Sequence, residues 1–309
     1  MRNPLAEVFG YPVEDRSQAA VNHREGRLCP FHNSSGLRCT KNSVTDPLGV
    51  CSILAGDTIA ITCPIRFRQD MQIVVDAARF FFPNGANYVT LTEVRLNGRD
   101  GNSAGNIDLV LAELNEQGQV IDFGAVEVQA VYITGNVSNV FKAYMQAPEV
   151  NFNLDWPSRN YPKPDYLSSS RKRLAPQLIY KGGILHGWGK KMVVGVHSAF
   201  FAQLPTLQET TLQDAEIAWF IYDLQREPPD GRYKLVLAKT VYTKFKEAMD
   251  KITVTEAGNV EDFLHSLQIR ITKGKVMGQP MQSGISPDVE PITTFEGEAF
   301  SASDNSGEE

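Results

Sequence analysis

Three polar side chains stand in apolar segments near the middle of the chain, where a charge is costly unless it meets a cation or a partner. Asp108 lies in the run IDLVLAEL, and Glu127 and Gln129 lie two residues apart in the run GAVEVQAV. Side chains two apart on a strand share one face. Carboxylates that converge from adjacent strands suit Mg²⁺, which can bind a phosphate oxygen and lower the pKa of an attacking water. The pattern predicts a metal-dependent hydrolytic site.

Glu93 is a further acid near this pattern, embedded in the preceding run YVTLTEVRL (88–96). We expect it to lie on a neighbouring strand and to add a third carboxylate to the site. A second interpretation stays open, in which Glu127 and Gln129 face solvent on an edge strand and carry no chemistry.

All four cysteines of the chain fall near its start, in turn-rich segments: Cys29, Cys39, Cys51 and Cys63. Because no export signal is visible, disulfides are disfavoured and a tetrahedral thiolate metal site is the better interpretation. Four thiolates leave no open position, so the metal would be structural, and such soft ligands allow either iron or zinc. Three alternatives stay open: buried reduced thiols, His32 in place of one cysteine, or two disulfides.

The segments around the acids must fold so that the acids converge. Helical spacing of apolar residues predicts a helix over 66–82. Alternating apolar residues predict strands over 88–96, 107–114 and 120–133, the last two joined by a hairpin connection. A second helix is predicted to begin near Ser138. The expected order is helix, three antiparallel strands, helix.

The second half of the chain is predicted to add further strands and helices. The stretch 166–190 turns helical after a serine cluster and is the most basic part of the chain, either as a solvated face or as a phosphate contact. We predict a strand followed by an irregular aromatic segment at 191–204, and two more strands at 215–224 and 233–242. Two amphipathic helices are predicted at 243–252 and 259–271. The fold class is therefore α/β, a mixed sheet flanked by helices, with the small four-cysteine segment packed against it.

Composition and charge bound the class of protein. The 309 residues are 42% hydrophobic, with a net charge of −6, as in ordinary globular proteins. All 30 Lys and Arg residues lie at or before Lys275, so the acidic charge is concentrated at the end and a nucleic-acid partner remains compatible with the rest. We predict a metal-binding segment at 1–64, a core with recognition elements at 65–276 and an acidic, poorly ordered tail at 277–309. No apolar run is long enough for a membrane span and no secretory signal is visible, so a cytoplasmic location is expected.

The four cysteines and the acidic pattern together resemble the NotI family of type II restriction endonucleases. The segments that carry the resemblance are EVFGYP (7–12), LCPF (28–31), CTK (39–41), GVCS (49–52), GNIDLVL (105–111) and AVEVQAVYITG (125–135). The resemblance implies a PD-(D/E)XK nuclease core beside a structural iron or zinc ion. It also implies a homodimer that cuts both strands of double-stranded DNA at a palindromic, GC-rich site.

The resemblance also assigns roles to the acidic residues. Asp108, Glu127 and Gln129 match the active-site strand positions, with Gln129 where lysine is commonest. Glu93 matches an extra acidic position on the preceding strand. Because a glutamine can only orient a water through its amide, more of the electrostatic work falls on the metal, and an absolute requirement for a divalent cation is expected.

Two other classes of function remain as alternatives to a Mg²⁺-dependent, sequence-specific endonuclease. One is a non-catalytic DNA-binding regulator, in which the carboxylates are inert. The other is a phage or repair nuclease that acts on DNA structure. The joint presence of Asp108, Glu127 and Gln129 favours a nuclease over a regulator, because a pure binder has no need of buried carboxylates near phosphates.

Overall fold

The computed structural model describes residues 3–32, 36–56, 58–227, 231–254 and 257–275. The chain divides into two units, Met1–Thr255 and Glu256–Glu309. The second unit contains helix α10 (Val260–Thr272), which was predicted. The acidic tail at 277–309 lies outside the described residues, and the domain boundaries at 64 and 276 stay predictions. Within the described ranges, no helix is long and apolar enough to cross a membrane.

The first unit is built on a six-stranded mixed sheet in the order β12-β11-β10-β7-β6-β5. Its strands are β5 (Tyr88–Asn97), β6 (Ser103–Leu114), β7 (Val120–Gln129), β10 (Met192–His197), β11 (Ile217–Arg226) and β12 (Tyr233–Thr243). The predicted antiparallel meander is confirmed, because β5 pairs with β6 and β6 pairs with β7 in that sense. β10 runs parallel to both β7 and β11, which makes β7 an interior strand.

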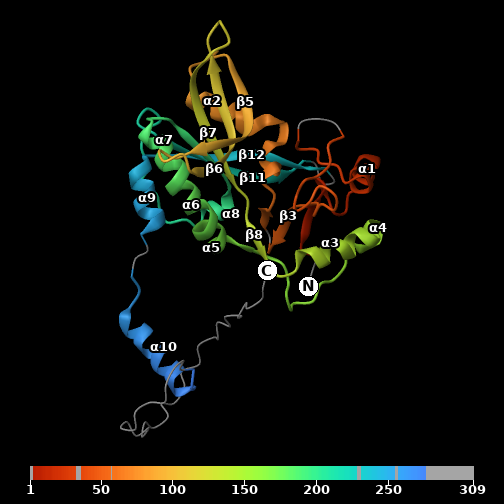
Figure 1. Ribbon diagram of the computed structural model, residues 1–309. Coiled ribbons are helices and arrows are strands. Elements are labelled where there is room, and N and C mark those ends of the chain that lie inside the picture. The colour runs from red at the N-terminus through yellow and green to blue at the C-terminus, as the bar shows by residue number, and fades with distance from the viewer. Residues whose placement is uncertain (1–2, 33–35, 57, 228–230, 255–256, 276–309) are drawn as a thin grey trace, which may run out of the picture. The chain divides into compact units, whose positions relative to one another are not determined.

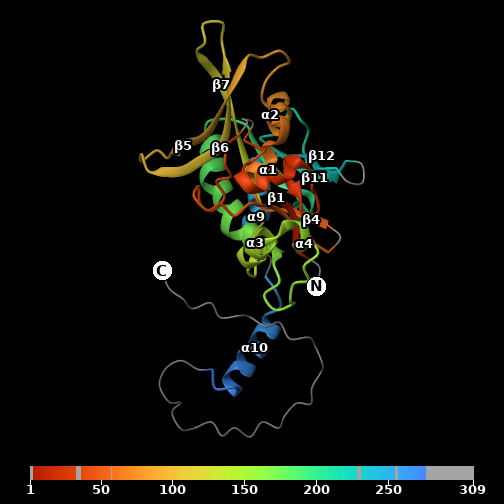
Figure 2. The same cartoon turned by 90° about the vertical axis from the view of Figure 1, so that its right-hand side faces the viewer.

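Helices cover both faces of this sheet (Figures 1 and 2). On one face, helix α2 (Gln72–Phe81) packs its apolar stripe against Val126 and Val128 of β7. On the other face, the helices that follow residue 166 pack against Ala125 and against β10. Since side chains alternate along a strand, the odd-numbered residues of β7 after Ala125 face this second layer. The predicted α/β class, a mixed sheet flanked by helices, is confirmed.

The second helical layer is a continuous run of short helical segments. It comprises α5 (Tyr166–Ser169), η2 (Ser170–Leu174), α6 (Ala175–Gln177), η3 (Leu178–Gly182) and α7 (Gly183–Gly187). Two of these segments, η2 and η3, are π-helical turns, a rare form that is frequently found at functional sites. α8 (Ser198–Phe201) replaces the predicted irregular segment, and α9 (Phe245–Thr253) completes the layer.

Two predicted elements are interrupted. The helix predicted over 66–82 is a 3-10 segment, η1 (Pro64–Met71), followed by α2, because Asp70 and Met71 adopt left-handed backbone angles of φ 53° and 55°. The strand predicted over 120–133 ends at Gln129. There the backbone turns towards β4 (Thr58–Ile61), since Val131 N donates to Ile61 O at 2.9 Å.

The chain after this turn forms a small ribbon and two helices. β8 (Tyr132–Thr134) pairs with β9 (Lys163–Asp165). α3 (Val137–Gln146) begins beside the predicted Ser138 because the side chain of Asn136 accepts from Asn139 N as its N-cap, and α4 (Pro148–Asn151) follows.

The N-terminal region forms a second sheet that the sequence pattern did not predict. Its strands are β1 (Leu5–Val8), β2 (Tyr11–Pro12), β3 (Val50–Ala55) and β4 (Thr58–Ile61), and they lie in the order β2-β1-β3-β4. Helix α1 (Gln18–Gly26) lies between β2 and β3 in the sequence. Its core also takes in Val140, Phe141 and Tyr144 of α3. The cysteine-rich segment is therefore packed on a helix that follows the meander.

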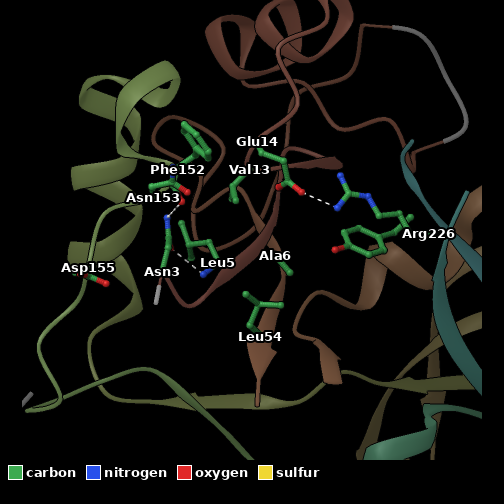
Figure 3. Close-up of a pocket in the computed structure, with 11 residues that line it drawn as sticks. Asn3, Leu5, Ala6, Val13, Glu14, Leu54, Phe152, Asn153, Asp155 and Arg226 are labelled. Atoms are coloured by element: carbon green, nitrogen blue, oxygen red, sulfur yellow. Dashed lines mark hydrogen bonds and ion pairs between the residues drawn. The ribbon is translucent and has the colours of Figure 1, made fainter. Parts of the chain in front are cut away.

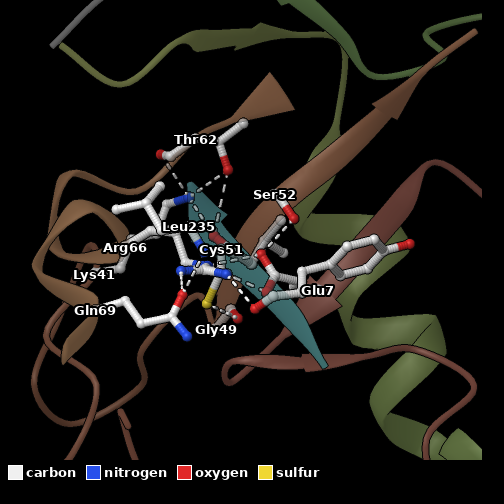
Figure 4. A network of polar contacts seen from close by, with 11 residues as sticks. Glu7, Lys41, Gly49, Cys51, Ser52, Thr62, Arg66, Gln69 and Leu235 are labelled. Carbon is white, nitrogen blue, oxygen red and sulfur yellow. Dashed lines mark hydrogen bonds and ion pairs between the residues drawn. The ribbon is translucent and has the colours of Figure 1, made fainter. Parts of the chain in front are cut away.

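A buried polar network joins the N-terminal sheet to the six-stranded sheet (Figure 4). Arg66 of η1 contacts Glu7 of β1, and its Nη2 donates to Tyr233 O of β12 at 2.8 Å. Glu7 also accepts from Ser52 Oγ at 2.7 Å, and Gln69 accepts from Arg66 Nη1 at 2.6 Å. The two sheets are thus connected by a buried ion pair and its hydrogen bonds as well as by apolar packing.

Candidate active site

Glu127 and Gln129 lie in the middle of the sheet. β7 is flanked by β6 and β10, and the exposed fractions are 1% for Glu127 and 3% for Gln129. The alternative interpretation, in which both face solvent on an edge strand, is therefore wrong. Both side chains point towards the helical layer that follows residue 166, because they alternate with Val126 and Val128, which pack against α2.

Asp108 lies beside this position on the adjacent strand and takes part in the hydrogen bonding of the sheet. Its Oδ2 accepts from Val128 N at 2.8 Å. Asp108 was predicted at the start of its strand but lies in the middle of β6, which begins at Ser103. Burial raises the pKa of its carboxyl, and the nearby charge of Glu93 adds to this rise, while Lys181 opposes it.

Glu127 is held by a lysine from the helical layer. Lys181 Nζ donates to Glu127 Oε1 at 2.7 Å and to Oε2 at 2.8 Å. Burial raises the pKa of Glu127 to about 8, and the charge of Asp108 adds to the rise, while Lys181 opposes it. Asp108 is therefore close enough to influence the ionisation of Glu127. Buried acids with raised pKa values that sit next to a specific charged partner are typical of functional sites.

Gln129 shares the face of Glu127 but not its contacts. Its Nε2 donates to Ala130 O at 2.5 Å, where the strand ends. The position pairs with Val196 of the parallel strand β10. The structure thus places Gln129 on the same face of the sheet as Glu127, and the contacts of the described residues include no hydrogen bond between its amide and either carboxylate.

Glu93 lies on β5, on the outer side of the same group. It stands between the paired positions Thr92–Leu109 and Val94–Ile107, which places it across from Asp108. Its backbone has a left-handed φ of 53°, and its side chain is 58% exposed, with an ion pair to Arg68 at 3.7 Å. Glu93 is therefore near Asp108 but is not part of the buried pair.

The carboxylates of buried Glu127 and half-buried Asp108 fit a divalent cation by their chemistry. Carboxylate oxygens are the ligands that Mg²⁺ prefers, and it is commonly held by one or two of them together with substrate phosphates. Among the residues that the structure describes, no group of three or more His, Cys, Asp or Glu is arranged to hold a metal ion. In the described part of the chain, Asp108 and Glu127 are thus a pair of carboxylates and not part of a group of three such residues.

The four cysteines come from two paired segments. An antiparallel bridge between Leu28 and Arg38 sets Cys29 beside Cys39. The antiparallel pairing of β3 with β4 brings the other two cysteines together, one on β3 and one directly after β4. All four are buried and unpaired by disulfides, which leaves the two-disulfide alternative without support.

The thiols lie within electrostatic reach of one another. Burial raises the pKa of Cys29 to about 12, and the charges of Cys63 and Cys39 add to the rise. Burial likewise raises the pKa of Cys51. The ammonium group of Lys41 is close by and donates to Val50 O at 2.6 Å. Four such thiols are a suitable set of donors for iron or zinc. In the described part of the chain, however, they are not arranged into a metal-binding group.

Sequence reasoning assigned Lys181 only to a basic stretch and missed its contact with Glu127. A signal was present in the spacing. Leu174, Leu178, Lys181 and Leu185 follow the interval of a buried helical stripe, and the three leucines are all buried. A lysine at a core position of such a stripe needs an internal acid as its partner.

A separate pocket lies in the N-terminal region, away from the acids (Figure 3). It has a volume of about 320 Å³ and is lined by Asn3, Leu5, Phe152 and Arg226, among others. Arg226 is paired with Glu14 at 2.7 Å across its wall. None of the predicted catalytic residues or cysteines lines it.

A comparison of the chain with sequence models of protein families gives a match over most of its length. The sequence model of the family described as "Restriction endonuclease NotI" matches residues 7–235, more than half of the chain. The matched region contains Asp108, Glu127, Gln129, Glu93 and all four cysteines. No curated protein matches the chain. The chain therefore belongs to the NotI family of restriction endonucleases and is a site-specific deoxyribonuclease that acts on double-stranded DNA.

Proposed function

We propose that this protein is a Mg²⁺-dependent type II endonuclease whose phosphodiester hydrolysis takes place at Asp108 and Glu127. The observation that carries the proposal is the position of two acids on adjacent strands, β6 and β7. Burial raises the pKa of both carboxyls, and the charge of Asp108 raises the pKa of Glu127 further. Restriction endonucleases usually use Mg²⁺. A bound cation would relieve the repulsion between these two carboxylates, and this argues for a metal at this position.

Each residue has a stated role in the proposal. Asp108 and Glu127 would hold Mg²⁺ through carboxylate oxygens. When bound, this ion supplies the charge that neutralises the phosphate and acidifies a water molecule. Gln129, on the same face as Glu127, would orient that water through its amide. Glu93, the exposed acid across from Asp108, would act as an outer ligand or as a ligand of a second metal ion.

The arrangement around the acids agrees with a PD-(D/E)XK core, which we propose for this region. An antiparallel β5-β6-β7 meander follows helix α2, and β10 joins β7 in parallel. This order puts the acids on interior strands, where the sheet fixes their positions. In the same arrangement, the acids face the helical layer that contains the basic stretch 166–190.

We further propose that the enzyme is a homodimer and reads a palindromic, GC-rich site. Two identical active sites related by a two-fold axis cut the two strands at symmetric positions. Guanine is the base most often read by bidentate Arg or Lys, and basic clusters at 95–99 and 171–191 are candidates. Light scattering with and without DNA, together with sequencing of the cut ends, tests both points. A monomer in both states or asymmetric ends would contradict the proposal.

The four cysteines are proposed to hold one structural ion of iron or zinc. Support comes from the chemistry of four buried, reduced thiols that share one region and influence one another's ionisation. Cys29, Cys39, Cys51 and Cys63 would be its ligands. The ion would fix the turns that carry the cysteines and take no part in hydrolysis, because four thiolates leave no open coordination position.

The decisive experiment incubates purified protein with a plasmid and with genomic DNA, in Mg²⁺ and in EDTA. Discrete fragments that appear only with Mg²⁺ support the proposed function. A smear would indicate a nuclease without sequence specificity, such as one that acts on DNA structure. A mobility shift without cutting in any divalent cation would indicate a regulator and overturn the assignment of Asp108 and Glu127.

A further inference from the structure

Lys181 occupies a position in the helical layer where an apolar residue is expected. It lies on the π-helical turn η3, and only 5% of its surface is exposed. One turn before it is Leu178 and one turn after it is Leu185, both buried in the core of the layer. A lysine therefore lies inside a stripe of buried leucines, where its charge is removed from water at a cost in free energy.

The ammonium group of Lys181 uses all of its donors on the site. An ammonium has three N–H groups. Two are directed to the two oxygens of Glu127, and the third reaches Asn106 O at 2.5 Å, two residues before Asp108. Lys181 therefore bridges the two strands that carry the acids.

The backbone beside Lys181 is shaped to admit it. Gly105 has a left-handed φ of 103°, and a Cβ atom built there would lie 3.3 Å from Lys181 Cε. A side chain at position 105 would press on the lysine, and its backbone angle is one that L residues rarely adopt. The glycine, the π turn and the lysine form one built arrangement around the carboxylates.

An ordinary structural ion pair is a poor explanation for this arrangement. A buried pair seldom stabilises a fold more than apolar residues of similar volume would. A leucine at position 181 would continue the apolar stripe without burying a charge. The acid that Lys181 contacts is also one of the two to which hydrolysis is assigned, and the strand position of the usual lysine holds Gln129.

We propose that Lys181 is a further functional residue of the nuclease site and supplies, from the helical layer, the positive charge that Gln129 does not. This inference rests on the proposed function. Before a divalent cation binds, Lys181 holds Glu127 in place. Once the carboxylate is shared with the cation, the ammonium charge remains beside the acids and stabilises the charge that develops on the phosphate.

The test separates metal binding from hydrolysis in Lys181→Met and Lys181→Gln, the second of which keeps a hydrogen-bond donor but no charge. Lys239→Met is the matched control. Lys239 of β12 is also paired with an acid, Glu209, at 3.2 Å, but both side chains are exposed. Mn²⁺ binding to each free protein is measured by electron paramagnetic resonance at pH 8.5. Single-turnover DNA cleavage is measured in Mg²⁺, and thermal unfolding is recorded for each variant.

The expected result is a split between the two readouts. Without the competing ammonium, both Lys181 variants bind Mn²⁺ at least as tightly as wild type. Cleavage falls by about 10² or more, as when one stabilising group is removed from an active site. Lys239→Met changes neither readout. Should Lys181→Met fail to fold, Lys181→Gln decides the question.

Two outcomes overturn the inference while wild type still cuts DNA. Cleavage by a folded Lys181 variant within about tenfold of wild type would show that the lysine only holds Glu127 before a cation binds. Mn²⁺ binding that weakens together with thermal stability in both variants would show a purely structural residue. If wild type itself does not cut DNA, the proposed function fails first, and the inference falls with it.

Discussion

Arg66 Nε donates to both carboxylate oxygens of Glu7, at 3.2 and 3.0 Å, and neither side chain has any exposed surface. Arg66 lies on η1, at the edge of the six-stranded sheet, and Glu7 lies on β1 of the N-terminal sheet. The guanidinium also lies over the ring of Phe31, 4.3 Å from its centroid. The contact therefore connects the cysteine-containing region to the part of the protein that carries the acids.

Removal of one partner of this pair should destabilise the whole first unit. We expect Glu7→Ala to lower the free energy of unfolding by about 3–5 kcal/mol, because it leaves the Arg66 charge buried without its partner. Glu14→Ala is the matched control, since Glu14 pairs with Arg226 in a partly exposed position and should cost less than about 1 kcal/mol. Urea unfolding monitored by circular dichroism measures both. Equal effects in the two variants would contradict the prediction.

Substitution of either Asp108 or Glu127 should abolish cleavage but not DNA binding. Asp108→Ala and Glu127→Ala each remove a carboxylate that the proposed metal needs. Because two like charges near a phosphate repel it until a cation arrives, Glu127→Ala should bind DNA at least as well as wild type in EDTA. Plasmid cleavage and mobility shift at equal protein concentration measure the two effects.

The control for these variants is Asp122→Ala, an exposed acid on the same strand as Glu127, which should cut normally. Gln129→Ala should be slower without being inactive. If Asp108→Ala or Glu127→Ala cuts within about tenfold of wild type, the catalytic site lies elsewhere in the protein.

The cysteine site should contain one metal ion per chain. Metal analysis by mass spectrometry should find about one equivalent of iron or zinc, and Cys51→Ser should lose it. Since thiolate sites can contribute on the order of 10 kcal/mol to folding, this variant should unfold the N-terminal sheet. His32→Ala should retain the metal if the four cysteines are its ligands. Four titratable thiols in a stable, metal-free protein would refute the prediction.

Acid should destabilise the protein through His197. This residue ends β10 and is buried, and its Nε2 lies 3.6 Å from Asp223 Oδ1. Burial lowers its pKa below the ordinary value of 6.5, while Asp223 opposes the shift. As pH falls below 6.5, the unfolded chain takes up this proton before the folded one does. The folded state therefore loses up to about 1.4 kcal/mol per pH unit from this group.

Comparison of wild type with His197→Gln isolates this effect from other titrating groups. The two proteins should differ more in unfolding free energy at pH 7.5 than at pH 5.5, since the variant lacks the acid-sensitive contribution. The measurement is urea unfolding at both pH values. An unchanged difference between the two proteins would show that His197 has the same pKa in the folded and unfolded chains.

The meander was predictable because its signals are local. Alternating apolar residues define β5, β6 and β7, and the short connection at 115–119 joins β6 to β7. The acids could be found for the same reason, since a charge inside such an alternation stands out. Their positions on adjacent strands then follow from the period of two.

The elements that were missed depend on distant partners. β1 has four residues and β2 has two, too few to show a period, and they form because β3 pairs with β1 from more than 40 residues away. The end of β7 at Gln129 is likewise set by a distant contact, from Val131 N to Ile61 O. The pairing of Lys181 with Glu127 spans the two halves of the chain and leaves only an indirect trace in the leucine spacing.

The hydrogen bond from Val128 N to Asp108 Oδ2 has a practical consequence for studies of the DNA complex. Alanine at position 108 removes an acceptor from the backbone of β7 together with the metal ligand, so it loosens the strand that carries Glu127. Asparagine keeps an oxygen acceptor of nearly the same shape while removing the charge. Asp108→Asn is therefore the variant suited to trapping uncut DNA for crystallisation, because it silences the chemistry and leaves the sheet intact.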